Sequence, residues 1–386
     1  MKRIYLDYAA TTPVDSRVIK AMEPYFSLEF ANTMSIHGMG EEAAEAVEKA
    51  RKQVAQLIEA KPERVFFTGS ATESNNWVIK GIAWANRDKG KHLIISAVEH
   101  DCVLRSAEWL KKEGWEVSIL GVDEDGLIRL DELEKMIKKD TVLVSVIHGN
   151  NEVGTIQDLE KIGRICRDKG VYFHTDAAQS FGKEKIEAEK MKVDLLTASS
   201  HKIYGPKGAA CLYIREGVKI VPLLHGGGQE NRMRSSTVNV PAVVGFGKAA
   251  EICAKKMERE NKRVKDLRDK LIKGILKISG TRLNGHPVNR LANNANISFK
   301  GIEGESLLLR LDMRGIEVST GSACSSQSLE PSHVIVAMGL GAETAHGSIR
   351  FSLGRWTKEE EIDEVLKVLP KIVADLKKIS PYKDYA

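Results

Sequence analysis

A lysine suited to imine chemistry lies near the middle of the chain. Lys202 ends an apolar segment and stands just before the turn-forming residues Tyr204-Gly205-Pro206. An amine that condenses with an aldehyde must be partly neutral at pH 7, so desolvation or a cationic neighbour must lower its pKa from about 10.4. A solvated surface lysine, the commoner location of this residue, does not meet that requirement. The choice between the two interpretations depends on the residues that accompany Lys202.

An acid and a possible phosphate cradle accompany it. The strand-like run 171–175 ends in Asp176, a carboxylate that could pair with the protonated pyridine nitrogen of pyridoxal phosphate (PLP) or merely cap a helix. The buried run 65–68 leads into a small-residue turn and a helix start, where free backbone N–H groups can bind a phosphate. Ser70 or Thr72 could instead serve only as the helix cap. Taken together with Lys202, these motifs predict a PLP site.

The elements that position these residues alternate between short apolar runs and amphipathic helices. This pattern is typical of a mostly parallel sheet covered by helices. We expect strands at 65–68, 92–96, 117–120, 142–148, 171–175, 195–198 and 211–214, and helices at 42–58, 72–88, 103–113, 130–138 and 159–169. A long polar helix follows Pro241. The remainder predicts a smaller α+β domain, with elements at 295–299, 305–314, 318–320, 348–351 and 358–378.

Composition limits the function classes. The 386 residues allow two or three domains, and the net charge of +5 comes without a basic tract that would indicate nucleic-acid binding. No run approaches the ~20 apolar residues of a membrane span, and Asp7 interrupts any signal-peptide core. The cysteines are too scattered for a metal site and too few for a disulfide scaffold: Cys102, Cys166, Cys211, Cys253 and Cys324. We therefore expect a cytoplasmic protein with no membrane, metal or nucleic-acid partner.

Ordered motifs along nearly the whole chain resemble the cysteine desulfurases of the NifS/IscS type, in the class V aminotransferase group of fold-type I PLP enzymes. They lie at 6–13, 97–100, 150–155, 175–179, 199–208, 225–230, 322–324 and 348–355. The resemblance implies a seven-stranded, mostly parallel sheet in a large PLP-binding domain (14–252). It also implies a small domain (1–13 and 253–386), whose loop 319–332 carries the catalytic cysteine, and a homodimer with shared sites.

The resemblance assigns roles to individual residues. His100 would stack on the pyridine ring and exchange protons with the substrate, although a histidine there could merely cap a helix. Asn151, otherwise a turn residue, would lie beside the ring and help to hold the substrate carboxylate. Gln179 would donate a hydrogen bond to the ring's phenolic oxygen. The phosphate would be held by Ala71, Thr72, Ser199 and His201, and by Thr237 of the neighbouring subunit.

Two more residues concern the substrate. Arg350 lies in an apolar strand, where an unpaired guanidinium would be costly to bury. A bidentate clamp on an amino-acid carboxylate resolves this cost, and an internal salt bridge is the alternative. Cys324 lies in a polar, small-residue segment that should be a surface loop, where a thiol can ionise. The resemblance makes Cys324 the nucleophile that accepts sulfur.

The implied activity is PLP-dependent removal of sulfur from L-cysteine. The products would be L-alanine and a persulfide on Cys324, passed to an IscU-like scaffold protein of iron–sulfur cluster assembly or to another thiolation acceptor. The alternatives are a selenocysteine lyase or class V aminotransferase, in which Cys324 is incidental, and a catalytically silent platform for sulfur-transfer proteins. The chain departs from the family at Thr33, Met34 and Ser236, and its tail after Ser380 is short.

Overall fold

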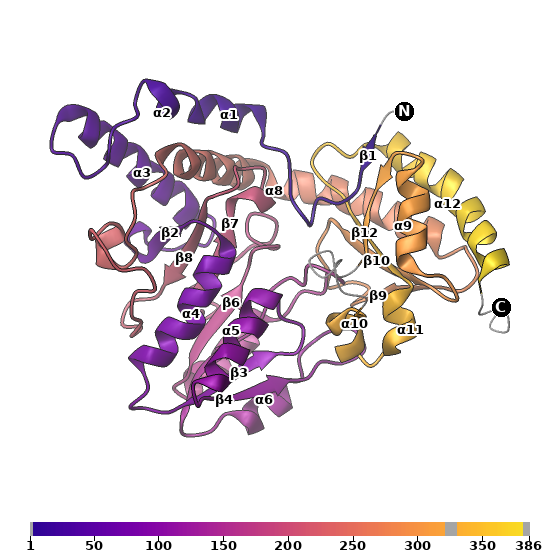
Figure 1. Cartoon of the computed structure of the whole chain (residues 1–386), viewed down its shortest axis with the longest axis horizontal. Coiled ribbons are helices and arrows are strands. Elements are labelled where there is room, and N and C mark those ends of the chain that lie inside the picture. The colour runs from indigo at the N-terminus through magenta and orange to yellow at the C-terminus, as the bar shows by residue number, and fades with distance from the viewer. Residues whose placement is uncertain (1–2, 321–329, 381–386) are drawn as a thin grey trace.

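The computed structural model describes residues 3–320 and 330–380. Figure 1 shows two parts side by side, a large sheet covered by helices and a smaller part that contains both ends of the described chain. The long helix α8 (Val240–Ile275) runs from one part into the other. Within the described residues, no helix is long and apolar enough to cross a membrane.

The large part is built on a seven-stranded sheet in the order β2-β8-β7-β6-β5-β3-β4. Only β8 runs antiparallel to its neighbours. The strands are β2 (Val65–Thr68), β3 (His92–Ser96), β4 (Glu116–Leu120), β5 (Thr141–Ser145), β6 (Tyr172–Asp176), β7 (Leu195–Ser199) and β8 (Ala210–Ile214). This confirms the predicted fold class and all seven expected strands.

Helices cover both faces of this sheet, which explains why its strands read as continuous apolar runs. Successive strand residues enter opposite cores: Phe67 and Ile94 pack with α3 and α8, whereas Phe66 and Ile95 pack with α4 and α5. The helices of this part are α1 (Ser16–Met22), α2 (Pro24–Ser27), α3 (Gly38–Gln56), α4 (Ala71–Ala85), α5 (Asp101–Lys112), α6 (Leu130–Met136) and α7 (Leu159–Asp168).

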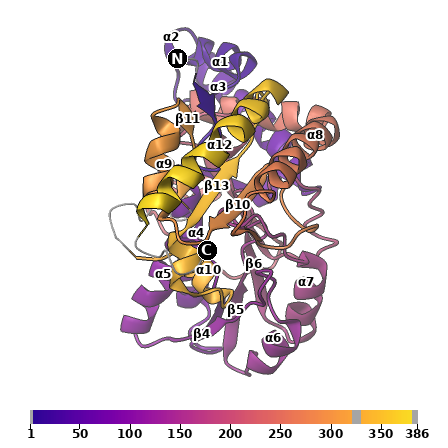
Figure 2. The same cartoon turned by 90° about the vertical axis from the view of Figure 1, so that its right-hand side faces the viewer.

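The smaller part has its own antiparallel sheet, in the order β12-β13-β10-β9, and a short parallel pair, β1-β11. Its strands are β1 (Ile4–Tyr5), β9 (Thr281–Asn284), β10 (Asn294–Phe299), β11 (Ile316–Glu317), β12 (Ser319–Thr320) and β13 (Ser348–Ser352). Its helices are α9 (Gly304–Asp312), α10 (His333–Ala337), α11 (Gly341–His346) and α12 (Glu359–Ile379). In Figure 2, α12 crosses in front of β10 and β13.

The N-terminal segment packs into the core of the smaller part. Ile4 and Leu6 share a core with residues of α8, β10, β13 and α12, and Asp7 forms an isolated bridge with Ser352, the last residue of β13. The N-terminal segment then passes from the small part to the residues that follow the central strands β6 and β7, where the Thr12 N–H bonds to the His201 carbonyl oxygen. This path determines how residues 7–12 reach the candidate site.

Candidate active site

A cavity of about 910 Å³ opens at the carboxyl ends of the central strands. It brings together most of the residues that sequence analysis selected. The selected residues among those that line it are Ala71, Thr72, His100, Asn151, Asp176, Gln179, Ser199, His201, Lys202 and Arg350. Thr237 is exposed and is not among the lining residues. Cys324 lies outside the described residues.

The amino end of α4 supplies the predicted anion cradle. Ser70 is the N-cap, and its hydroxyl accepts a hydrogen bond from the backbone N–H of Glu73 at 3.1 Å. Glu73 in turn accepts from the Gly69 N–H at 2.9 Å and forms an ion pair with Arg234 at 2.7 Å. These contacts hold the turn so that Ala71 and Thr72, with the positive end of the helix, face the cavity. Ser70, rather than Thr72, is therefore the cap.

Asp176 ends β6 and is nearly buried, with 4% of its surface exposed. Its carboxylate accepts hydrogen bonds from the Asn75 side chain at 2.6 Å and from the Ala178 N–H at 2.8 Å. Both donors are neutral, and no ion pair to Asp176 occurs within the described part of the chain. A buried carboxylate with only neutral donors is well suited to a cationic ligand group.

His100 caps a helix, as the simpler interpretation predicted, and it also faces the cavity. It is the N-cap of α5, where Nδ1 accepts the backbone N–H of Cys102 at 3.2 Å, and its ring also lines the cavity. Because Nδ1 is the acceptor, the neutral ring carries its proton on Nε2. Cys102 Sγ lies 3.1 Å from the same Nδ1. The cap thus fixes which nitrogen can deliver a proton.

The N-terminal segment closes one side of the cavity. Lys202 Nζ donates to the carbonyl oxygens of Ala9 at 2.6 Å and Ala10 at 2.8 Å, and Gln179 Nε2 donates to Ala9 O at 2.8 Å. Gln179 Oε1 is buried without a hydrogen-bond partner in the described residues. The segment therefore contacts the amine and the amide that sequence analysis assigned to the cofactor.

His201, next to the lysine, is a neutral hydrogen-bonding group. Its burial, together with the nearby charge of Lys202, lowers the pKa of the imidazole to about 4. Nδ1 lies 3.1 Å from the Thr11 hydroxyl. An uncharged ring at pH 7 can take part in a phosphate site through a hydrogen bond, but it adds no charge there.

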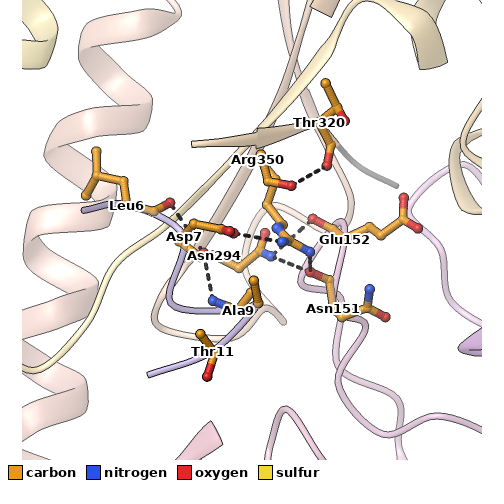
Figure 3. A network of polar contacts seen from close by, with 12 residues as sticks. Leu6, Asp7, Ala9, Thr11, Asn151, Glu152, Asn294, Thr320 and Arg350 are labelled. Atoms are coloured by element: carbon orange, nitrogen blue, oxygen red, sulfur yellow. Dashed lines mark hydrogen bonds and ion pairs between the residues drawn. The ribbon is translucent and has the colours of Figure 1, made fainter. Parts of the chain in front are cut away.

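Arg350 lies on β13 in the small part and lines the cavity. Figure 3 shows its guanidinium between Asp7 and the Asn151 carbonyl oxygen. Its Nη2 donates to Asp7 Oδ1 at 2.8 Å, and its Nη1 donates to the carbonyl oxygen of Asn151 at 3.1 Å. Nε is buried and has no partner among the described residues. The internal salt bridge considered as an alternative is therefore present. The Nε atom of the same guanidinium can still donate a hydrogen bond.

Both chain segments that flank the undescribed residues 321–329 lie beside this site. Ser319 pairs with Arg350 across the β12-β13 ladder, and Glu330 lines the cavity. Farther along, the Ser332 hydroxyl donates to the buried Glu152 carboxylate at 2.5 Å, and His333 Nε2 lies 2.9 Å from the Glu99 carbonyl oxygen. Residues 319 and 320, which sequence analysis placed in the loop 319–332, instead form strand β12 because they pair with β13. The described residues on both sides of 321–329 lie beside the cavity.

The sequence pattern of the family described as aminotransferase class-V matches residues 4–365. A cysteine desulfurase IscS of Methanosarcina thermophila is 51% identical over 380 residues, covering 98% of this chain and 94% of that protein. The chain belongs to the IscS-type cysteine desulfurase family. A mitochondrial cysteine desulfurase of Saccharomyces cerevisiae is 49% identical over 98% of this chain and 76% of its own length. A solved NifS-like protein superposes with a TM-score of 0.92 at 40% identity, covering 97% of this chain and all of that one.

The cofactor of this family is PLP, and the cavity of this family member fits it. The uncompensated Asp176 carboxylate matches the protonated pyridine nitrogen, and the amino end of α4 matches the phosphate. The partnerless atom of Gln179 is the acceptor Oε1, and Nε2 already donates to Ala9 O, so a hydrogen bond from the amide to the ring's phenolic oxygen would use the second N–H of Nε2. Lys202 provides an amine on the same cavity wall.

Several site residues of this desulfurase were not found by sequence reasoning. Asn75 lies one turn into α4, and nothing in its local pattern distinguishes it from a surface residue of an amphipathic helix. Cys102 was counted only as a scattered cysteine, yet it lines the cavity. Asp7 belongs to a recognised motif, but its partner Arg350 is 343 residues away. Contacts of this kind are set by the tertiary fold.

Proposed function

We propose that this protein is a PLP-dependent cysteine desulfurase that converts L-cysteine to L-alanine and transfers the sulfur to an acceptor. One observation carries the proposal: a single cavity collects Lys202, Asp176 and Arg350, and the two ends of the segment that contains Cys324 lie beside it. An imine-forming amine, an acid for a pyridinium and a guanidinium for a carboxylate are the groups that PLP chemistry on an amino acid needs.

Each of these residues has a task in the proposed reaction. When bound, PLP supplies an electron sink that stabilises negative charge at the substrate Cα. Asp176 holds the pyridine proton, and the α4 amino end with Ser199 and His201 holds the phosphate. Arg350 orients the substrate carboxylate, with Asn151 beside it. Lys202 Nζ takes the Cα proton and His100 Nε2 exchanges protons with the substrate.

Sulfur transfer itself is assigned to Cys324. Its thiolate attacks the substrate sulfur, so that an S–S bond forms as the Cβ–S bond breaks. The electron pair of the broken bond stays on Cβ, which takes up a proton to complete the methyl group of L-alanine. The sum is L-cysteine plus enzyme thiol giving L-alanine plus enzyme persulfide, which needs no external oxidant or reductant.

We also propose a division into a large PLP-binding domain (14–252) and a small domain (1–13 and 253–386). The separate core that unites Ile4 and Leu6 with residues from Val264 onward supports it. The acceptor is proposed to be an IscU-like scaffold or another thiolation protein. A cytoplasmic location is proposed because the cysteines in the described residues are unpaired.

The homodimer is proposed on the basis of an apolar patch near the N-terminus. Seven large apolar side chains between residues 19 and 39 are exposed: Ile19, Phe26, Leu28, Phe30, Met34, Ile36 and Met39. Such a concentration is unusual for a surface that remains in water. The assignment of Thr237 to a neighbouring subunit's cofactor likewise requires a second copy of the chain.

The test uses the PLP-loaded protein, L-cysteine and quantification of L-alanine. We expect Cys324→Ala to retain the absorbance of the bound cofactor and to lose most alanine formation. The matched control Cys166→Ala changes a buried cysteine of α7 outside the cavity and should remain active. Full turnover by Cys324→Ala would support the rival lyase or aminotransferase, and no cofactor binding by wild type would support the silent platform.

A further inference from the structure

Asn75 is a fully buried asparagine in the interior of α4. Asparagine is a poorer helix former than leucine, and burying its amide costs free energy unless the polar atoms are hydrogen-bonded. Here Oδ1 has no partner among the described residues, whereas Nδ2 has two. A leucine could be buried at this position at a lower cost. The contacts of the amide nitrogen are therefore the ones that need a functional reason.

Both acceptors of Asn75 Nδ2 belong to residues that line the large cavity. They are Asp176 Oδ2, at 2.6 Å, and Cys102 Sγ, at 3.0 Å. Asn75 itself does not line the cavity. If the amide were turned over, Oδ1 would face the carboxylate oxygen, and two acceptors cannot form a hydrogen bond. The carboxylate thus selects the orientation of the amide, and the amide holds the carboxylate.

The place of Asn75 on α4 relates the acid to the phosphate cradle. Ala71, at the start of the helix, lines the cavity, and Asn75 follows it by four residues and so lies on the same side of the helix. One helix therefore contacts both ends of the space that fits the cofactor. The Ala178 N–H donates to Asp176 Oδ1 at 2.8 Å, so each carboxylate oxygen has one donor from a different segment. No donor to Oδ2 other than Asn75 occurs among the described residues.

We propose that Asn75 is a positioning residue for the desulfurase reaction. It holds the Asp176 carboxylate in place and stabilises its negative charge, so that the proton shared with the pyridine nitrogen of PLP stays on the nitrogen. A hydrogen bond to the charged form of an acid favours that form. Without this donor the proton moves toward Asp176, and the ring becomes a weaker electron sink. The inference rests on the proposed function, because it needs PLP beside Asp176.

The direct test measures the protonation of the pyridine nitrogen without turnover. Full-length protein is loaded with PLP that carries ¹⁵N in the ring, because the ¹⁵N NMR frequency distinguishes a protonated from a neutral nitrogen. Wild type should give the protonated signal. Asn75→Leu, which replaces the amide by an apolar group of similar size, should move the signal toward that of a neutral nitrogen. The matched control Asn76→Leu, on the same helix, loses only an amide that bonds to the Thr72 carbonyl oxygen, and it should keep the wild-type signal.

Cofactor affinity and kinetics provide a second measurement. Asn75→Leu should weaken PLP binding about tenfold, because a hydrogen bond to a charged group is lost. It should lower kcat about tenfold and change KM for L-cysteine by less than about threefold, since Arg350 is untouched. Asn75→Ala cannot overpack the helix and should shift the ¹⁵N signal and these constants in the same directions. It keeps the test decisive if Asn75→Leu does not fold.

Two results would overturn the inference. One is an unchanged ¹⁵N signal in folded, PLP-loaded Asn75→Ala and Asn75→Leu, even with weaker PLP binding, because it would show that Asn75 has only a structural role. The other is a neutral nitrogen in the wild-type protein. A wild-type protein that binds no PLP would instead overturn the proposed function itself, so the two failures are distinguishable.

Discussion

Asp7 Oδ1 accepts a hydrogen bond from Arg350 Nη2 at 2.8 Å, across nearly the full length of the sequence. Arg350 lines the large cavity and Asp7 does not, so the aspartate contacts the guanidinium from the side away from the substrate space. Asp7 is therefore a positioning residue. It anchors one nitrogen while the Asn151 carbonyl anchors another (Figure 3).

The first prediction concerns this anchor. Asp7→Ala should raise KM for L-cysteine about tenfold, with kcat changed by less than about threefold, because a charged hydrogen bond that orients the carboxylate-binding group is lost. Asp7→Asn retains an acceptor in the same place and should lie close to wild type. Steady-state kinetics measure kcat and KM for each variant.

The matched control is Glu317→Gln, which removes the charge of a half-buried carboxylate on β11 that pairs with Arg3. It should leave both constants unchanged. An equal fall of kcat in Asp7→Ala and Asp7→Asn, with KM unaltered, would show that Asp7 does not act through the carboxylate-binding arginine.

The second prediction concerns backbone strain at Ser236. Its φ is 152°, in the region that favours glycine, and its side chain is exposed. Ser236→Gly should stabilise the protein by about 1 kcal/mol, since the relief of strain exceeds the entropic cost of glycine. Denaturant midpoints measure the change. The control Ser279→Gly, at an exposed serine without positive φ, should be neutral or destabilising; the reverse order would contradict the strain argument.

The third prediction concerns pH. Burial raises the pKa of Glu99 to about 8, above its ordinary 4.5. Between these values the native state retains a proton that the unfolded chain has released, so this residue favours folding most at low pH and loses that contribution as pH rises toward 8.

Glu99→Gln removes this titration. The stability of the variant relative to wild type should therefore increase between pH 5 and pH 8, by roughly 2–4 kcal/mol. Burial lowers the pKa values of His148 and His174 to about 4 and about 3, and these two residues therefore make stability rise with pH. Both are present in wild type and in the variant, so their effect cancels in the comparison. Unfolding midpoints at the two pH values test this. Glu113→Gln, at an exposed site, should show no such difference, and a flat profile for Glu99→Gln would refute the assignment.

The fourth prediction concerns assembly. Replacing Phe30 and Ile36 of the exposed apolar patch by serine should weaken the homodimer at least tenfold, because apolar area buried in the interface is lost. Analytical ultracentrifugation measures the dissociation constant. Val288→Ser changes an apolar side chain that is 71% exposed in the small part and should leave association unchanged. If the wild-type protein sediments as a monomer, the proposed homodimer is wrong.

The strands of the large sheet could be predicted because burial on both faces makes each a compact apolar run. The prediction of 142–148 was too long, as β5 ends at Ser145. Beyond Ser145 the chain still bonds along its neighbour, because the N–H groups of Val146 and His148 donate to the carbonyl oxygens of His174 and Asp176. Gly114 and Gly170 have φ of +81° and +69°, as expected after helix ends.

The short elements of the small part were harder to predict. The two-residue strands β1 and β11 carry too few residues for any periodicity, and they pair across more than 300 positions. β9, at Thr281–Asn284, was overlooked because only its last residue is buried, which leaves no alternating pattern. Motif recognition located Lys202, Asp176 and Arg350, but their partners Asn75 and Asp7 depend on contacts that only the fold creates.

The most direct test of the proposed activity is a single turnover of the PLP-loaded protein with L-cysteine, followed by alkylation and peptide mass spectrometry. The account predicts one L-alanine per active site and a peptide carrying one additional sulfur atom at Cys324. Alanine without added sulfur at Cys324, or sulfur on another cysteine such as Cys102, would contradict it.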